Sequence, residues 1–226
     1  MMSIPTNLQE IHKSLPETAR LVAVSKFHTV ENIVEAYQAG QRIFGESRAQ
    51  EFEEKYKQLA PIAKDIQWHF IGHLQRNKVK FIVPYVAMIH SLDSLRLYRT
   101  INREAEKIGR IVPCLLQLHI ADEHTKYGFT FEECRALLHS GKWKDFKNVH
   151  LSGVMGMATL TDNQELVRKE FKTLKNFFDE VKETYFADDP CFKEISMGMS
   201  QDYPIAVEEG STLIRVGSKI FGERAY

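Results

Sequence analysis

The sequence predicts one α/β domain over residues 1–226, folded as a single (β/α)8 TIM barrel with an extra N-terminal helix. Two observations support this. Short β-branched or aromatic apolar runs alternate with longer polar segments of helical periodicity, as in parallel strands joined by helices. Eight such units fit into 226 residues, a length that closed barrels commonly have. An open, doubly wound sheet is the alternative, because it uses the same units.

In the first half of the chain the pattern predicts four strands, each followed by a helix, after a leading helix near residues 8–15. The first of the four helices carries Ile33, Val34 and Tyr37 at helical intervals, and Gly40 is expected to end it. The expected strands are 21–24, 42–45, 66–71 and 86–89, and the expected helices are 30–39, 48–59, 75–82 and 94–108.

The second half repeats this alternation. Two irregular stretches, 121–130 and 159–163, follow strands, and such loops lie on the active face of a barrel. The expected strands are 112–120, 149–157, 194–197 and 212–216, and the expected helices are 131–139, 164–185 and 203–209.

Composition excludes several classes of function. Thirty basic residues balance thirty acidic ones, which argues against a nucleic-acid partner. Cys114, Cys134 and Cys191 form neither a zinc spacing nor a disulfide framework, which favours a reducing compartment. No segment approaches the ~20 apolar residues of a membrane span, and the N-terminus lacks an apolar signal region. We therefore expect a cytoplasmic protein with no membrane partner.

Two strand ends carry the most informative chemistry. The first strand runs into Lys26, whose amine becomes a nucleophile when partial burial disfavours the ammonium form. The last strand runs into Arg215-Val-Gly-Ser218, and a closed barrel places it beside the first. Gly217 permits close approach of a phosphate, to which its N–H and the Ser218 hydroxyl can donate. A lysine beside a phosphate pocket suits a covalently held phosphorylated aldehyde, for which pyridoxal 5'-phosphate (PLP) is the obvious candidate.

Each of these two segments also has a purely structural interpretation. Lys26 can simply leave the core for solvent, and Gly217 with Ser218 can form a turn and a helix cap. A second loop of small residues, Ser196-Met-Gly-Met-Ser200, precedes the last strand by one unit. Loops after the seventh and eighth strands often build phosphate sites in barrels, although Ser200 is equally an expected N-cap for the helix 203–209.

Histidines and carboxylates give no comparable signal for a metal. His69 and His73 have i, i+4 spacing, but they are expected on a strand and in the following loop, where that spacing does not converge. No carboxylate lies beside them at a telling interval, and Glu46 is expected either to reach a ligand or to cap a helix. We therefore expect no metal. A metal-dependent or sugar-phosphate barrel enzyme would need a carboxylate cluster that the strand ends lack.

Together these segments, which span residues 21–222, resemble the pyridoxal phosphate homeostasis proteins of the YggS/PROSC type, which are similar in fold to the barrel domain of alanine racemase. The arginine–x–glycine tail and the loop of alternating serine, methionine and glycine make the resemblance specific. The matching segments are Ala23–Lys26, Phe44–Glu46, Trp68–Gly72, Leu74–Gln75, Asn77–Lys78, Lys126–Gly128, Gly153–Met155, Ser196–Ser200 and Arg215–Gly222.

The resemblance implies a barrel without the racemase's second domain. It implies PLP bound as an internal aldimine (Schiff base) on Lys26, and Arg215 facing the pyridine nitrogen. Many members have asparagine at the position of Ser47, so this chain departs from the pattern there. The resemblance also implies phosphate contacts from Ser200, Gly217 and Ser218. It further implies that Ser47, Met155 and Ser196 lie near the cofactor.

An arginine at the ring nitrogen has a chemical consequence. A carboxylate there keeps the nitrogen protonated and makes the ring a strong electron sink, whereas a guanidinium cannot accept the proton. The weak sink suits a PLP carrier in intracellular PLP homeostasis without catalytic turnover. PLP and PLP-dependent apoenzymes are the implied partners, and a monomer suffices. The alternative is a PLP-dependent amino-acid racemase or related lyase, which needs a second base, usually a tyrosine from a partner domain.

Overall fold

The computed structural model describes residues 3–121 and 127–222 and shows a closed barrel of eight parallel strands. Neighbouring strands follow the chain order, and β8 closes the ring by pairing with β1. The predicted TIM barrel is therefore confirmed, and the open sheet is excluded. The strands are β1 Arg20–Val24, β2 Ile43–Glu46, β3 Gln67–Phe70, β4 Met88–Leu92, β5 Val112–Gln117, β6 Val149–Met155, β7 Glu194–Ser196 and β8 Leu213–Val216.

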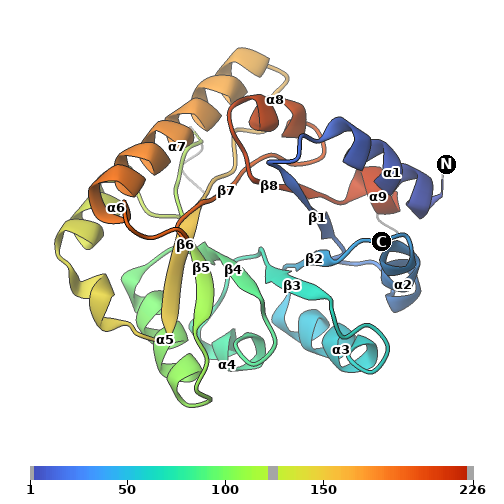
Figure 1. Cartoon of the computed structure of the whole chain (residues 1–226), viewed down its shortest axis with the longest axis horizontal. Helices are drawn as coiled ribbons and strands as arrows, with labels where there is room; N and C mark the ends of the chain where they lie inside the picture. The colour runs from blue at the N-terminus through green and yellow to red at the C-terminus, as the bar shows by residue number, and fades with distance from the viewer. Residues whose placement is uncertain (1–2, 122–126, 223–226) are drawn as a thin grey trace.

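The helices lie outside the ring of strands, as Figure 1 shows. The first of them is the predicted extra N-terminal helix, and it packs beside the last, where the Asn7 side chain donates to the Ile220 carbonyl at 2.9 Å. The α-helices are α1 Ile4–Ser14, α2 Val30–Gln38, α3 Ala49–Leu59, α4 Val79–Ile82, α5 Leu95–Glu106, α6 Phe131–His139, α7 Gln164–Tyr185, α8 Tyr203–Glu208 and α9 Ser218–Phe221, with 3-10 turns η1 Arg76–Lys78 and η2 Lys142–Asp145.

Local sequence explains where several helices begin. Ser3, Thr29 and Ser94 cap α1, α2 and α5 by accepting from a backbone N–H three residues on. Thr130 and Glu133 form a reciprocal capping box at α6. Within the described residues, no helix is both long and apolar enough to cross a membrane.

The core has two parts. The larger part fills the space between the strands and the surrounding helices. The smaller part lies inside the barrel and includes Val22, Leu115, Met155 and Leu213. Because both faces of every strand are covered, the strands are buried almost throughout.

Two sequence expectations need correction. The fourth strand lies at Met88–Leu92 rather than 86–89, because the polar His90 and Ser91 are buried within it. Ser200 is not the N-cap of α8: Asp202 holds that position, and the Ser200 hydroxyl lies 3.4 Å from the Gly217 nitrogen instead. Both errors arose because a polar side chain was taken as a sign of exposure or capping.

Candidate functional site

A cavity of ≈ 170 Å³ opens at the carboxyl ends of β1 and β8. This is smaller than the roughly 300–1,000 Å³ of sites for drug-sized ligands, so it suits a compact molecule. The barrel brings six of the eight sequence-predicted residues to its wall. They are Lys26, Ser47, Ser200, Arg215, Gly217 and Ser218.

Lys26 lies half-buried in the turn between β1 and α2. The strand ends at Val24, and the turn is closed by a bond of 3.0 Å from the His28 N–H to the Ser25 carbonyl. Phe27 has a φ of 67°, in the left-handed region that non-glycine residues seldom occupy. This conformation sets the direction in which the preceding lysine leaves the backbone.

A buried ion pair holds the start of that turn. Lys55 of α3 donates to the Ser25 carbonyl at 2.7 Å and to Glu46 of β2 at 2.9 Å, and the Ser25 hydroxyl donates to Glu46 at 2.6 Å. Glu46 is fully buried, and this burial raises the pKa of its carboxyl although Lys55 opposes the shift. Its second oxygen is buried without a partner. The pair anchors Ser25, the residue before Lys26.

The other side of the turn is held from α3 as well. The Phe27 N–H donates to the Glu51 carboxylate at 2.6 Å, and the Arg48 guanidinium lies over the Phe27 ring, 4.5 Å from its centre. Lys26 is thus flanked by two anchored residues, so its side chain leaves a backbone of defined geometry.

Another part of the cavity wall is built from small residues. Ser200 comes from the loop after β7, whereas Gly217 and Ser218 follow β8. A Cβ on Gly217 would lie 3.1 Å from the Val24 carbonyl and 3.2 Å from the Val24 Cβ, so a side chain there would crowd the end of β1. Two hydroxyls and an uncrowded backbone N–H form a donor set that fits a phosphate group.

Arg215 also lines the cavity and is almost fully buried. Its Nη1 donates to Ser196 Oγ at 2.5 Å and its Nη2 to the Gly156 carbonyl at 3.1 Å. Burial lowers the pKa of this guanidinium to about 10, so it stays charged at neutral pH. It is therefore a fixed cation with further N–H donors beyond these two bonds.

A hydrogen-bonded chain runs from this arginine across the barrel interior. Ser196 Oγ lies 2.9 Å from His90 Nδ1, and His90 Nε2 lies 2.8 Å from His69 Nδ1. Burial lowers the pKa of His69 to about 3 and that of His90 well below its usual value, and the Arg215 charge adds to the shift at His90. Both imidazoles are therefore neutral at pH 7.

Acid should weaken the fold through these two histidines. The unfolded chain binds a proton at each below pH ~6.5, whereas the folded state does not until the pH is far lower, so stability falls as the pH drops. From pH 6.5 to 5 each group contributes a loss of about 2 kcal/mol in the free energy of unfolding. Glu46 acts in the opposite sense, because its raised pKa makes the folded chain the better proton acceptor at this carboxyl as the pH falls.

Urea unfolding at pH 6.5 and pH 5 measures this loss. His69→Gln and His90→Gln should each flatten the pH dependence, whereas His139→Gln, at an exposed position, should not. A double variant with the slope of the wild type would show that these groups do not titrate as their burial requires.

Two sequence-predicted residues do not reach the cavity wall. Met155 packs in the apolar cluster inside the barrel, and Ser196 lies behind Arg215. Conversely, the wall includes residues that sequence reasoning did not single out. Four of them lie within segments already noted: Val24, Ile71, Met199 and Gly222. The other two, His28 and Met157, each lie two residues beyond such a segment.

The histidines 69 and 73 are separated, as their spacing predicted. His69 is bonded to His90 inside the barrel, whereas His73 lies at the surface, 3.1 Å from Asp93 and stacked on Tyr127. The structure therefore places a carboxylate beside His73 that the sequence did not indicate. Lys126, which belongs to one of the resembling segments, lies outside the described residues.

Comparison with known proteins gives consistent matches over nearly the whole chain. The family model "Alanine racemase, N-terminal domain" matches residues 2–225. The pyridoxal phosphate homeostasis protein of Aquifex aeolicus is 38% identical over 208 residues, which are 92% of this chain and 88% of that protein.

Solved structures agree. PipY of Synechococcus elongatus PCC7942 is known without PLP, with a TM-score of 0.91 and 36% identity, and with PLP bound, with a TM-score of 0.88 and 35% identity. Both matches cover 97% of this chain and 100% of PipY. Alanine racemase of Clostridium difficile 630 shares the fold, with a TM-score of 0.76 at 15% identity over 99% of this chain and 56% of the racemase.

Proposed function

We propose, from the premise that this chain belongs to the family of pyridoxal phosphate homeostasis proteins, that it binds PLP reversibly through Lys26 and acts as a carrier rather than an enzyme. One observation supports this above the others. A half-buried lysine, a set of phosphate donors and a buried guanidinium line the same small cavity. That arrangement matches the aldehyde, the phosphate and the ring nitrogen of one compact molecule.

The residues of the cavity divide the binding between them. The Lys26 amine attacks the aldehyde carbon, and a C=N bond forms as water leaves. Ser200, Gly217 and Ser218, which also line the cavity, donate to the phosphate oxygens. A side chain at position 217 would crowd Val24, so glycine suits this position and leaves the backbone open to close approach by a phosphate.

Arg215 is proposed to face the ring nitrogen. Its bonds to Ser196 and Gly156 restrict the guanidinium, and its charge repels a proton from the nitrogen. Bound PLP supplies an electron sink for chemistry at an amino acid's α-carbon, and the sink is weak when the nitrogen is unprotonated. With this arrangement the protein holds PLP but does not convert amino acids.

The racemase alternative has one observation in its favour, because His28 also lines the cavity. This histidine is stacked on Phe221 at 4.8 Å and comes from the same turn as Lys26. Two-base racemisation needs bases on opposite faces of the cofactor. Among the described wall residues there is no tyrosine to supply one opposite Lys26.

Amino-acid turnover should therefore be slow. Loss of one positioned base removes about 10²–10⁴-fold of rate, so we expect α-proton exchange far below the ordinary enzymatic range of about 1–10³ s⁻¹. The measurement is α-proton exchange into deuterated water for alanine and other amino acids, with protein saturated with PLP and product chirality followed over hours. Turnover in the ordinary range, lost in His28→Ala, would establish the racemase instead.

The carrier proposal extends to cellular partners. Free PLP reacts with amines generally, so a reversible reservoir in the cytoplasm has a chemical rationale. The recipients are PLP-dependent apoenzymes, and one barrel carries all the cavity residues named here, so a monomer suffices. Transfer of bound PLP to an apoenzyme, followed by recovery of that enzyme's activity, tests this step.

A further inference from the structure

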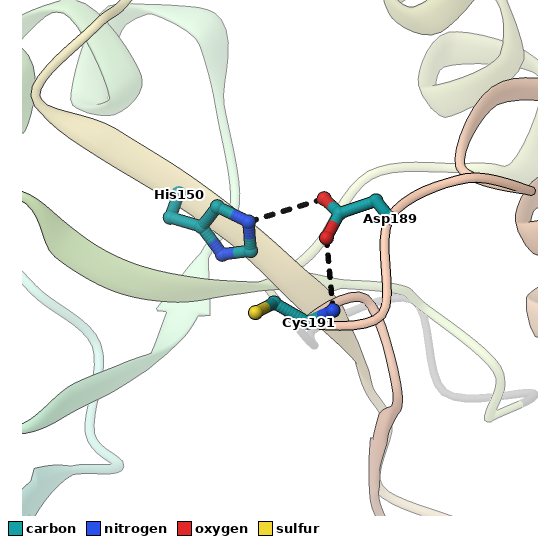
Figure 2. Close-up of side chains that lie close together, drawn as sticks. All are labelled: His150, Asp189 and Cys191. Carbon is teal, nitrogen blue, oxygen red and sulfur yellow. Dashed lines mark hydrogen bonds and ion pairs between the residues drawn. The ribbon is translucent and has the colours of Figure 1, made fainter.

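A second group of reactive side chains lies at the end of the barrel opposite the cavity. His150 is near the start of β6, and Asp189 and Cys191 are in the loop between α7 and β7. One donor atom from each lies within 4.8 Å of the other two. Figure 2 shows the carboxylate pointing toward the imidazole, with the thiol extending from the same loop beneath the ring in this view.

The chemistry of these donors is selective. An imidazole nitrogen, a carboxylate oxygen and a thiolate sulfur are the three kinds of ligand that Zn²⁺ takes in proteins, whereas Mg²⁺ and Ca²⁺ prefer oxygen alone. The imidazole and the carboxylate are each about one-third exposed, and the cysteine is exposed. An ion can therefore reach all three from solvent.

Neighbouring atoms already orient two of the donors. His150 Nδ1 lies 3.0 Å from Ser152 Oγ, and this contact leaves Nε2 directed at Asp189, 3.1 Å from Oδ2. The Cys191 backbone N–H donates to Asp189 Oδ1 at 2.8 Å, so Oδ2 is the oxygen left for a metal. Metal-binding histidines ordinarily have their second ring nitrogen held in this way.

We infer that His150 Nε2, Asp189 Oδ2 and Cys191 Sγ bind a Zn²⁺ ion, with water in the fourth position. Tetrahedral bonds of roughly 2.0–2.3 Å place donor atoms roughly 3.3–3.8 Å apart. The imidazole and carboxylate are already near this spacing, and rotation of the exposed Cys191 side chain brings the sulfur in.

Binding is balanced in charge and protons. The carboxylate and the thiolate together neutralise the two positive charges of the ion. The thiol proton leaves to solvent, and the imidazole keeps its one proton on Nδ1, beside Ser152 Oγ, so that Nε2 is free for the metal. Protons compete with the metal for these ligands, so affinity falls as the pH is lowered.

The place of the site in the fold indicates its role. It lies at the amino-terminal end of β6, and in barrels this end serves stability rather than catalysis. The ion would link β6 to the loop before β7, and a ligand that binds only the folded state stabilises it. This inference does not depend on PLP binding by the cavity.

Thiol alkylation gives a direct test, because Cys114 and Cys134 are buried and Cys191 is the one exposed thiol among the described residues. Zinc chloride should protect Cys191 from iodoacetamide and raise the melting temperature, whereas magnesium chloride should do neither. Co²⁺ should give the absorption of a tetrahedral thiolate site. The readouts use the protein without added PLP, so they are independent of the cavity.

Variants separate the site from a nonspecific charge effect. Asp189→Asn and His150→Ala should abolish protection, whereas Asp188→Asn, which removes the same charge from the exposed neighbouring residue, should leave it unchanged. Ser152→Ala keeps all three ligands and should weaken Zn²⁺ binding by about 10–100-fold, the usual cost of losing a supporting contact. Equal protection in wild type and Asp189→Asn, or none in the wild type, would overturn the inference.

Discussion

Lys26→Ala should remove the visible absorption band that we expect the wild-type protein to acquire when it is mixed with PLP. The band requires a C=N bond to an amine, and Lys26 is the lysine among the described residues that line the cavity. The barrel should fold normally, because Lys26 is in a surface turn whose backbone is held by Lys55 and Glu51. The measurement is a PLP titration followed by visible absorption, with circular dichroism to check the fold.

A matched control and a mapping experiment sharpen this result. Lys219→Ala removes an exposed lysine next to Ser218 that does not line the cavity, and it should leave the band intact. After borohydride reduction of the wild-type complex, peptide mapping should find the pyridoxyl group within residues 21–28. Its recovery only on another lysine, such as Lys78, would refute the assignment.

Ser200→Ala and Ser218→Ala should each weaken PLP binding about tenfold or more. Each hydrogen bond to a charged group contributes roughly 1.5–3 kcal/mol, and both serines line the same cavity as Lys26. Pyridoxal, which lacks the phosphate, should bind far more weakly than PLP to the wild type and should lose little affinity in either variant. Equilibrium titration of the wild type and of each variant, with PLP and with pyridoxal, measures these changes in affinity.

Ser47→Ala is the comparison for these variants. Ser47 also lines the cavity, but it comes from the loop after β2 and is not assigned to the phosphate. We expect its effect on PLP and on pyridoxal to be similar and smaller than tenfold. Equal affinity of the wild type for the two ligands would contradict a phosphate site altogether.

The barrel itself could be predicted because alternation of apolar and polar segments is a local property. Strand burial on both faces requires continuous apolar runs, and helices that cover them require an apolar stripe. The predicted bounds of the fourth strand were wrong because polar residues interrupt its apolar run. In β4, His90 and Ser91 are polar yet buried, because a side chain from another strand bonds to the histidine.

The principal cavity residues were also predictable, and for a related reason. In a parallel barrel every strand end points to the same face, and closure places the last strand beside the first. Lys26 and Gly217 are therefore neighbours by topology alone. Met155 differs: it is the last residue of β6, but its side chain packs into the apolar cluster inside the barrel instead of the cavity wall.

Contacts between distant side chains needed the tertiary structure. The chain from Arg215 to His69, the ion pair of Glu46 with Lys55, and the group of His150, Asp189 and Cys191 each join residues with no revealing spacing in sequence. The sequence alone determined the alternating strand and helix units, since these follow from local periodicity, and it favoured a closed barrel over an open sheet. Only the tertiary structure decided which buried polar groups bond across the barrel, because rotamers and burial depend on the packing of all eight strands.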